Sequence, residues 1–470
     1  MYTFPSTYPV ACHTDNVGPG STFVAIQGNK HDGAEYIPLA VHKGATTIVL
    51  QEDAQLSPEV SALVQAHNVQ LERVPNTRHA LALLSAHANG NPADKLRIIA
   101  VTGTKGKTTS VFLLEHVMRA AGYSVALLSS AHNSINGSIL PTNLTTQHPD
   151  YLHVFFKECV QQGVQWVIME AAAQAFSLHR VAGLQFDGIL FTNFDQTHAE
   201  FYTVVDDYFA AKCQIFTQRK GNAPVVINAD NAWCAQVLER VSKVTTYGIA
   251  TAAVDYRAQV AGDVGAGIVF DVQGHRLTCP SLLGLFSVYN LLGVACLAHQ
   301  LGIPFITIAQ AFLTFGAVPG RLERYPLANG ATCIIDYAHN PLSFESILST
   351  LRPLTPHLIV VFGCGGDRDK TMRPVMGGIA AKYADAVIIT TDNPRSEQVT
   401  AICDDIMAGI NQDTNAKVHV ILDRKEAIER AYTLANATTI IAVLGKGRDE
   451  YQLVGTTKTF FSDIQTVKGL

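Results

Sequence analysis

The segment Gly103-Thr104-Lys105-Gly106-Lys107-Thr108 contains the residues of this chain whose types and spacing are best suited to chemistry. An apolar, β-branched run at 98–101 precedes it, and a helical pattern of apolar residues follows Thr109. A strand, a tight glycine loop and a helix in this order bring backbone N–H groups onto phosphate oxygens at a helix N-terminus. Lys107 is then expected to reach the outer phosphates of ATP or GTP, and Thr108 to offer its hydroxyl to Mg²⁺.

This loop departs from the usual phosphate-binding spacing. The common pattern requires a glycine at position 101, where the chain has Val101, so the glycine loop is two residues shorter. Short loops of Gly, Lys and Thr also arise by chance. The strand before the loop and the helix after it favour nucleotide binding.

Composition limits the class of protein. A chain of 470 residues is too long for one hydrophobic core, so roughly two to four domains are expected. With 48% hydrophobic and 16% charged residues, the chain has the composition of a folded globular protein. A net charge of -5 without a basic run argues against nucleic acid as the main partner.

The sequence also indicates a cytoplasmic protein. Residues 1–5 lack the basic and apolar segments of a secretory signal, and no run reaches the ~18 apolar residues of a membrane span. The nine cysteines are scattered and form no Cys-x-x-Cys pair, which favours free thiols in a reducing compartment over disulfides or a zinc site.

The chain divides into three predicted α/β blocks, with boundaries at 1–94, 95–318 and 319–470. The first block ends in the polar segment 89–94, which is predicted to be a linker. In the second and third blocks, short apolar runs alternate with helical patterns, which predicts parallel, doubly wound sheets. The strands expected are 23–26, 47–50, 98–101, 166–169, 188–191, 225–227, 333–335, 359–362, 387–389, 418–421 and 440–443.

Polar or glycine residues directly follow six of these expected strands. In open α/β sheets, ligands bind beyond the carboxyl ends of the strands, so these positions are candidates for a site. They are Glu170, Asn193, Asp336, Gly363, Asp392-Asn393 and Gly445-Lys446-Gly447.

At these positions the chain resembles the Mur ligases, and within them the MurE type, over essentially its whole length. Five segments carry the resemblance, in matching order and spacing: 102–109, Asp336-Tyr337-Ala338-His339-Asn340-Pro341, 363–369, Asp392-Asn393-Pro394-Arg395 and Gly445-Lys446-Gly447. Mur ligases are three-domain cytoplasmic enzymes that join an amino acid to a UDP-sugar carboxylate in cell-wall precursor synthesis, converting ATP to ADP and phosphate. The resemblance implies a small N-terminal α/β domain for the UDP-sugar, a central parallel-sheet ATPase domain with the phosphate loop, and a C-terminal Rossmann-like α/β domain for the amino acid.

The implied reaction explains the residue types. A carboxylate is a poor acyl donor because its leaving group is oxide, whereas the acyl phosphate made by γ-phosphate transfer can be attacked by an amine. Phosphoryl transfer depends mostly on positioning and on neutralising charge. The resemblance implies a catalytic set of Lys107, Glu170, His198 and Lys212, and Mg²⁺ ligands at Thr108, Glu170, His198 and Lys212.

Two of these roles have ordinary alternatives. A lone histidine such as His198 is more often structural than a ligand, and Lys212 could be a plain lysine on an amphipathic helix. The resemblance implies instead that Lys212 is N-carboxylated, because a carbamate supplies two anionic oxygens for a second Mg²⁺. The implied nucleotide contacts are Gly103, Thr104, Gly106, Lys107, Thr108, Thr109, Asn290, Arg321 and Asp336, with Ser287 where the family usually has a second asparagine.

The amino acid is implied by the third block. Its Asp-Asn-Pro-Arg motif is the form linked in the family to meso-diaminopimelate, with Arg395 clamping the distal carboxylate. The further implied contacts are Arg368, Asn393, Gly445 and Asp449. The chain departs from the family by reading Gly-Lys-Gly-Arg-Asp, where Gly-Lys-Gly-His-Glu is usual, so the amino acid added stays open.

The carboxylate substrate fits the family pattern less well. Thr145, Thr146 and Arg180 are kept. The family reads Glu-Val-Ser-Ser-His-Ala-Leu where this chain has Ala171-Ala172-Ala173-Gln174 after Glu170, and Asp-Ser-Arg becomes His13-Thr14-Asp15. Each lost hydroxyl contact is worth about 1 kcal/mol, so several losses together could mean another acyl substrate.

Three readings follow. The first is a monomeric, ADP-forming MurE-type ligase acting on small molecules, UDP-N-acetylmuramoyl-L-alanyl-D-glutamate and a diaminopimelate-like amino acid. The second is a MurE-like paralogue that uses a different carboxylate. The third, a non-catalytic nucleotide-binding or regulatory protein, is disfavoured because the implied catalytic residues are all present.

Overall fold

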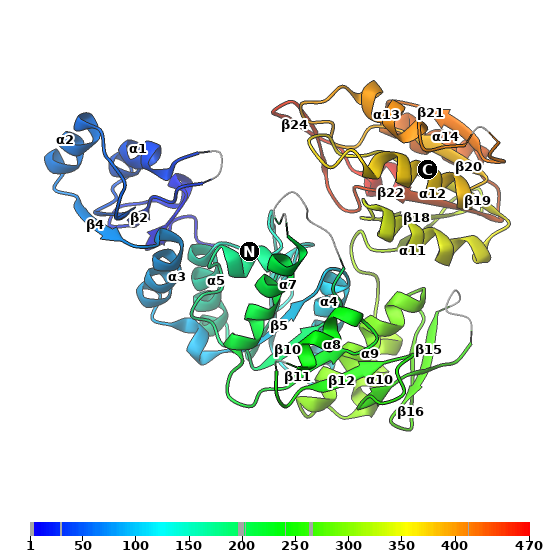
Figure 1. Ribbon diagram of the computed structural model, residues 1–470, viewed down its shortest axis with the longest axis horizontal. Coiled ribbons are helices and arrows are strands. Elements are labelled where there is room, and N and C mark those ends of the chain that lie inside the picture. The colour runs from blue at the N-terminus through cyan, green and yellow to red at the C-terminus, as the bar shows by residue number, and fades with distance from the viewer. Residues whose placement is uncertain are drawn as a thin grey trace. The chain divides into compact units, whose positions relative to one another are not determined.

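The computed structural model describes residues 4–28, 31–195, 202, 204–239, 241–262, 267–411 and 413–470 (Figure 1). The described chain forms two compact units. One contains the residues up to Tyr256 and Gly293–Ile308, and the other contains Arg257–Leu292 and the chain from Ala309 onward. Within the described residues, no helix combines the length and the apolar character needed to cross a membrane. All nine cysteines are free thiols.

The N-terminal part of the first unit is a small parallel sheet covered on both faces. The strand order is β1-β2-β3-β4, with β1 (Val10–Ala11), β2 (Thr22–Val24), β3 (Thr47–Gln51) and β4 (Gln70–Val74). One face buries apolar residues of α1 (Ile37–His42) and α2 (Pro58–Ala66), and the other buries Leu81 of α3 (Thr77–Ala88). The segment predicted to be a linker is packed instead, because it contains the 3-10 helix Pro92–Lys95, which contacts α5 (Pro149–Gln161).

The central sheet of the first unit is mostly parallel and carries the phosphate loop. Its strand order is β13-β12-β11-β10-β5-β9-β6-β7-β8. The strands are β5 (Arg97–Thr102), β6 (Val125–Leu128), β7 (Asn133–Ile135), β8 (Ser138–Leu140), β9 (Trp166–Glu170), β10 (Gly188–Phe191), β11 (Val225–Asn228), β12 (Thr245–Gly248) and β13 (Tyr256–Arg257). The connecting helices are α4 (Lys107–Ala120), α5, α6 (Ala173–Ser177), α7 (Val205–Cys213) and α8 (Ala232–Leu238).

The neighbours of β5 decide which side chains can reach the phosphate loop. β5 pairs in parallel with β9 on one side and with β10 on the other. The carboxyl ends of parallel strands meet at one edge of a sheet, so the residues after β9 and β10 flank the loop after β5. Glu170 and Asn193 therefore lie beside Gly103, as the strand pattern predicted.

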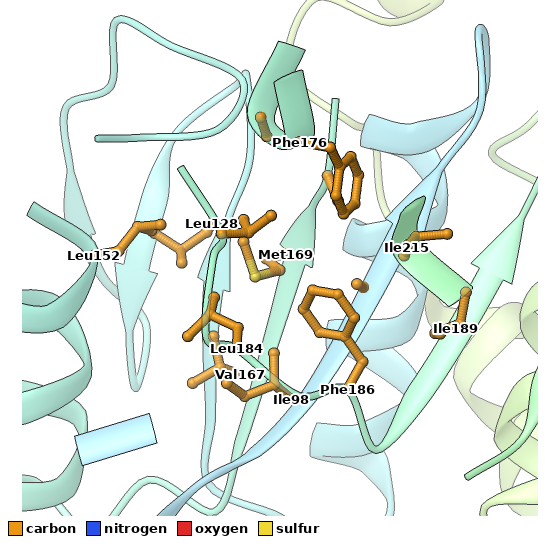
Figure 2. Close-up of a cluster of buried hydrophobic side chains, with 14 of the residues drawn as sticks. Ile98, Leu128, Leu152, Val167, Met169, Phe176, Leu184, Phe186, Ile189 and Ile215 are labelled. Atoms are coloured by element: carbon orange, nitrogen blue, oxygen red, sulfur yellow. The ribbon is translucent and has the colours of Figure 1, made fainter. Parts of the chain in front are cut away.

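The core on one face of this sheet is continuous and apolar (Figure 2). Ile98, Val167 and Ile189 project from three adjacent strands onto it, and Phe186 fills the space between them at 0% exposure. The opposite face is covered by α4, which packs on β6 and β9. Burial on both faces explains why these strands read as unbroken apolar runs.

The second unit contains two further sheets and a hairpin. The larger sheet has the order β17-β18-β22-β19-β20-β21, parallel except for the edge strand β17. Its strands are β17 (Glu323–Pro326), β18 (Thr332–Asp336), β19 (His357–Phe362), β20 (Ala386–Ile389), β21 (Lys417–Val420) and β22 (Thr439–Leu444). The antiparallel elements, which the sequence did not predict, are β14 (Gln259–Val260), β15 (Ile268–Val272) and β16 (His275–Cys279), and the hairpin of β23 (Tyr451–Val454) and β24 (Thr457–Phe460).

Alternating residues of β19 bury against helices on opposite faces of the larger sheet. Val360 packs in the core that includes α11 (Pro341–Leu351), α12 (Met372–Tyr383) and α13 (Val399–Met407). Val361 packs in the core that includes α14 (Arg424–Leu434) and α15 (Asp463–Lys468). The remaining helices, α9 (Leu285–Gln300) and α10 (Phe305–Thr314), each have residues in both units. The fold is thus mixed α/β with parallel sheets.

Phe186→Ala is expected to destabilise the first unit strongly. Removing a fully buried ring leaves a cavity as well as losing apolar burial, so the free energy of unfolding should fall by about 3–5 kcal/mol. Urea unfolding followed by tryptophan fluorescence would measure this, because Trp233 packs against this core and Trp166 is buried on β9 of the same sheet. Ile139→Ala, at a side chain 67% exposed, is the control. A loss below about 1 kcal/mol for Phe186→Ala would contradict the assigned core.

Candidate active site

The loop after β5 has a backbone shape that requires glycine at two positions. Gly103 has φ +140°, and a Cβ there would lie 2.0 Å from Thr192 Oγ1. Gly106 has φ +81° and is the N-cap of α4. Residues other than glycine rarely adopt such positive φ angles. The two glycines therefore let the chain turn tightly into α4 and direct the first N–H groups of the helix at a ligand.

The end of β10 holds this loop in place. The Asn193 side chain accepts a hydrogen bond from Lys105 N–H at 2.9 Å and donates one to Lys105 O at 3.2 Å. Thr192 Oγ1 donates to the same carbonyl at 2.6 Å, and Thr104 N–H donates to Asn193 O at 3.0 Å. These contacts organise the loop before any ligand binds.

Two lysines meet at one carbonyl oxygen of the loop. Lys107 Nζ donates to Gly103 O at 2.8 Å and to Thr104 O at 3.1 Å, and Lys212 Nζ donates to Gly103 O at 3.0 Å. Lys212 is 1% exposed and lies over the Tyr208 ring. Burial lowers the pKa of Lys212 well below its ordinary value, and the charge of Lys107 lowers it further. Burial and the neighbouring positive charge therefore both act against protonation of Lys212.

Three oxygen-bearing side chains form a connected chain beside the loop. Thr108 Oγ1 lies 2.9 Å from Ser130 Oγ, and Ser130 donates to Glu170 Oε1 through both its hydroxyl (2.9 Å) and its N–H (2.8 Å). Glu170 is 1% exposed. A buried carboxylate with two hydroxyls fits Mg²⁺, which prefers oxygen ligands, uses few protein carboxylates and takes substrate phosphates as well.

One predicted metal ligand cannot be placed in the structure. His198 lies outside the described residues. Within the described part of the chain, no three His, Cys, Asp or Glu side chains gather as a metal site. Ser130 was missed by the sequence analysis because it follows β6, a strand that was not among those expected; had β6 been predicted, Ser130 would have been a strand-end candidate like Glu170 and Asn193.

The residues predicted to hold the carboxylate substrate bind the turn after β9. Thr146 Oγ1 donates to Glu170 O at 2.9 Å and accepts from Ala172 N–H at 3.1 Å. Arg180 Nη1 donates to Thr146 O at 2.8 Å. Thr145 is partly exposed beside them. Burial, with a smaller effect from the nearby charge of Arg78, lowers the pKa of Arg180.

In the second unit, the predicted nucleotide residues also organise their own loops. The Asp336 carboxylate accepts Leu322 N–H at 2.8 Å and Ala338 N–H at 2.7 Å. The Arg321 guanidinium lies 4.8 Å from the centre of the Tyr337 ring.

Asn290, the predicted adenine-side residue, lies on α9 and is 6% exposed. Ser287, one turn earlier, donates its hydroxyl to Leu283 O at 2.6 Å, the carbonyl four residues before it.

The strand ends of the larger sheet bring most of the predicted amino-acid contacts together. Asn393 Oδ1 accepts from Leu453 N–H at 2.9 Å and from the buried Lys446 Nζ at 3.3 Å. A Cβ at Gly445, where φ is +110°, would lie 2.7 Å from Asp392 Oδ2. Burial raises the pKa of Asp449, and Lys446 opposes this shift. Lys446 was a strand-end candidate in the sequence analysis, but no role was predicted for it.

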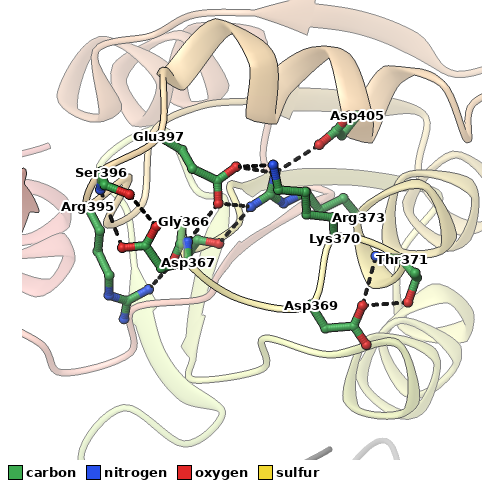
Figure 3. Close-up of polar contacts among 11 residues, drawn as sticks. Gly366, Asp367, Asp369, Lys370, Thr371, Arg373, Arg395, Ser396, Glu397 and Asp405 are labelled. Carbon is green, nitrogen blue, oxygen red and sulfur yellow. Dashed lines mark hydrogen bonds and ion pairs between the residues drawn. The ribbon is translucent and has the colours of Figure 1, made fainter. Parts of the chain in front are cut away.

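Arg395 is held by backbone contacts on both sides. Its N–H donates to Leu453 O at 3.0 Å, and its Nη1 donates to Gly366 O (Figure 3). Arg395 and Arg368 both act on the pKa of Tyr451, which burial raises. A Cβ built at Gly365 would lie 3.0 Å from Arg395 Nη1 and 3.6 Å from Arg368 Cγ, so the two arginines lie beside this glycine.

A glycine loop at a helix N-terminus, two lysines on one loop carbonyl and the buried Glu170 carboxylate bonded to Ser130 beside the loop are features of nucleotide-binding α/β enzymes of the phosphate-loop class. Three family models match the chain: the Mur ligase family, catalytic domain at 9–89, the Mur ligase middle domain at 101–298, and the Mur ligase, glutamate ligase domain at 320–447. Its relatives include proteins named UDP-N-acetylmuramoyl-L-alanyl-D-glutamate--2,6-diaminopimelate ligase. That of Clostridium perfringens is 35% identical over 95% of this chain and 91% of its own length, and that of Gloeobacter violaceus is 36% identical over 95% and 90%.

Solved structures of Mur ligases are also similar to this chain. A structure of a ligase with this name, 26% identical, has a TM-score of 0.66 and covers 98% of this chain and 94% of its own. MurF from Acinetobacter baumannii, at 15% identity and a TM-score of 0.67 over 98% and 92%, shares the fold. The chain belongs to the Mur ligase family, whose members are ADP-forming amide ligases with ATP and Mg²⁺. The predicted three-domain α/β architecture is confirmed; the boundaries between the domains stay a prediction.

Ser130→Ala is expected to weaken Mg²⁺ use. Losing the hydroxyl between Thr108 and Glu170 should raise the Mg²⁺ concentration for half-maximal phosphate release by roughly 10-fold, as for other residues that orient metal ligands. Ser138→Ala, at an exposed serine of β8, is the control. An unchanged Mg²⁺ dependence in Ser130→Ala would remove this residue from the metal pocket.

Proposed function

We propose that this protein joins meso-2,6-diaminopimelate to UDP-N-acetylmuramoyl-L-alanyl-D-glutamate, with conversion of ATP to ADP and phosphate, in the cytoplasmic synthesis of peptidoglycan precursors. Relatives that carry the name of this reaction are 33–36% identical over at least 95% of the chain. The single observation that carries the choice of amino acid is Arg395, in the loop that follows β20, whose guanidinium lies with Arg368 beside Gly365. We further propose that the protein acts as a monomer.

The first step transfers the γ-phosphate of ATP to the substrate carboxylate. A carboxylate oxygen attacks phosphorus, the bond to the bridging oxygen breaks, and ADP leaves. Lys107 neutralises charge on the outer phosphates, while the N–H groups at Gly103–Thr109 cradle them. Thr108, Ser130 and Glu170, with His198, would hold Mg²⁺, which supplies further positive charge at the β- and γ-oxygens when bound. Asn290, Arg321 and Asp336 belong to the adenosine end of the nucleotide.

The second step forms the amide. The amine of the amino acid attacks the acyl phosphate carbon, phosphate leaves, and the amine proton is lost. Arg395 pairs with the distal carboxylate in bidentate fashion, which lysine cannot offer. Arg368, Asn393, Gly445 and Asp449 complete this pocket. Asp449, one methylene shorter than the usual glutamate, would sit beside Lys446.

Lys212 is proposed to be N-carboxylated. Only a neutral amine attacks CO₂, and the lowered pKa of Lys212 supplies that form. The product is a carbamate with loss of one proton. Its negative charge would lie beside Lys107, so attraction to the Lys107 ammonium would replace the repulsion that a protonated Lys212 would meet. The carbamate oxygens would then be ligands for a second Mg²⁺.

A second candidate is a ligase of the same type that acts on another carboxylate. It is favoured by the turn after Glu170, where Ala173 begins α6 with no hydroxyl to offer, and by Asp15 where the family has an arginine. Thr145, Thr146 and Arg180 would contact the carboxylate substrate under either candidate.

Phosphate release across a matrix of UDP-muramoyl peptides and amino acids tests the proposal. The largest kcat/KM is expected for UDP-N-acetylmuramoyl-L-alanyl-D-glutamate with meso-diaminopimelate, and lysine should be used far less well because it leaves Arg395 unpaired. Lys107→Ala, which should abolish turnover, controls for contaminating ATPases. No release with the expected pair would refute the proposal and support the second candidate if another carboxylate is used.

The carbamate has its own test. After incubation with ¹³C-bicarbonate at pH 7, the wild type should show a carbamate carbonyl signal in ¹³C NMR that Lys212→Met lacks. Exposed lysines, with pKa near 10.4, are almost fully protonated at this pH and contribute little. The same signal in both proteins, or none in either, would show that Lys212 is not carboxylated.

A further inference from the structure

Two loops at the carboxyl edge of the larger sheet carry the arginines assigned to the amino acid. The loop 365–371 follows β19 and contains Arg368; the loop 393–397 follows β20 and contains Arg395. One side chain, Glu397, binds across from the second loop to the first (Figure 3). Its Oε1 accepts Asp367 N–H at 2.7 Å, and its Oε2 lies 3.1 Å from Lys370 Nζ.

The same carboxylate is paired with a buried cation. Arg373, 1% exposed at the start of α12, donates Nη2 to Glu397 Oε1 at 2.8 Å and Nη1 to Glu397 Oε2 at 3.0 Å. Its Nη1 also donates to Asp405 on α13 at 2.8 Å. The Arg373 pairing lowers the pKa of Glu397 to about 2. Glu397 is therefore an anion held rigidly by a guanidinium that has no access to water.

The loops are in close contact and are conformationally unusual. Gly366 N–H donates to Asn393 O at 2.9 Å, and a Cβ at Gly366 would lie 1.8 Å from Pro394 O. Asp367 and Arg395 have φ of +54° and +51°, a region that residues other than glycine seldom occupy. Such backbone persists only where the surroundings fix it. The hydrogen bond from Asp367 N–H to Glu397 helps to fix the unusual backbone of one of these two residues, Asp367.

We propose that Glu397 is a positioning residue for the amino-acid pocket: it locks the two loops together so that Arg368 and Arg395 are presented at a fixed spacing. This rests on the proposed function, in which those arginines bind the amino acid. Glu397 itself touches no substrate. Fixed spacing favours an amino acid whose carboxylates match it, so Glu397 acts on the choice between diaminopimelate and lysine.

Glu397→Ala and Asp405→Asn form a matched pair. Both remove one anionic partner of Arg373, but Asp405 lies on α13, outside both loops. Glu397→Ala should raise KM for the diacidic amino acid by roughly 10-fold or more, because small misplacements of binding groups are costly, and should reduce discrimination against lysine. KM for ATP should stay within about twofold, as should all parameters of Asp405→Asn. Equal changes in both variants, or equal changes in both KM values, would overturn the proposal.

Hydrogen exchange gives a readout that needs no substrate. Amides of 365–371 and 393–397 should exchange faster in Glu397→Ala than in the wild type or in Asp405→Asn. Unchanged exchange in both loops overturns the proposal whichever amino acid the protein uses, while a wild type inactive with diaminopimelate refutes only the proposed function. Should Glu397→Ala not fold, Ser396→Ala removes the separate Ser396–Asp367 hydrogen bond between the loops. It should then show the same pattern at smaller size, and no change in either loop would count against the proposal.

Discussion

The central constraint in this molecule is that the side-chain nitrogens of two lysines, Lys107 and Lys212, share the carbonyl oxygen of Gly103. Burial, and then the charge of Lys107, disfavour a second positive charge on Lys212 until negative charge arrives. The nucleotide phosphates supply such charge at Lys107, and a carbamate would supply it at Lys212. Three features fix the positions of the two lysines, so that anions can bind beside them. They are the glycine loop, the pairing of β5 with β9 and β10, and the contacts of Asn193.

Much of the fold could be predicted because its parallel strands are buried on both faces. β10 and β19 read as unbroken apolar runs, and the polar residue after each strand marks the binding edge. The antiparallel elements β14–β16 and β23–β24 were missed, because such short strands are specified by pairing partners rather than by a local pattern.

Site residues could be predicted only where a local sequence motif or the end of a predicted strand indicated them. Lys107, Thr108 and Glu170 follow from loop spacing and strand ends. Ser130 did not, because it matters through its contacts with Thr108 and Glu170, which lie 22 and 40 residues away in sequence. The pair of Arg373 and Glu397 was missed for the same reason: the two residues are 24 positions apart and meet only when β19 and β20 align.

The turn after Glu170 has an evolutionary consequence. Its shape depends on hydrogen bonds from the Thr146 side chain to main-chain groups of Glu170 and Ala172, and Arg180 in turn supports Thr146. Ala171 and Ala173 are buried in the core, whereas the side chains at 172 and 174 are partly exposed, so substitutions at these two positions can accumulate without moving the Glu170 carboxylate. A lineage can therefore drift toward a new acyl substrate while its energy-coupling machinery is inherited intact.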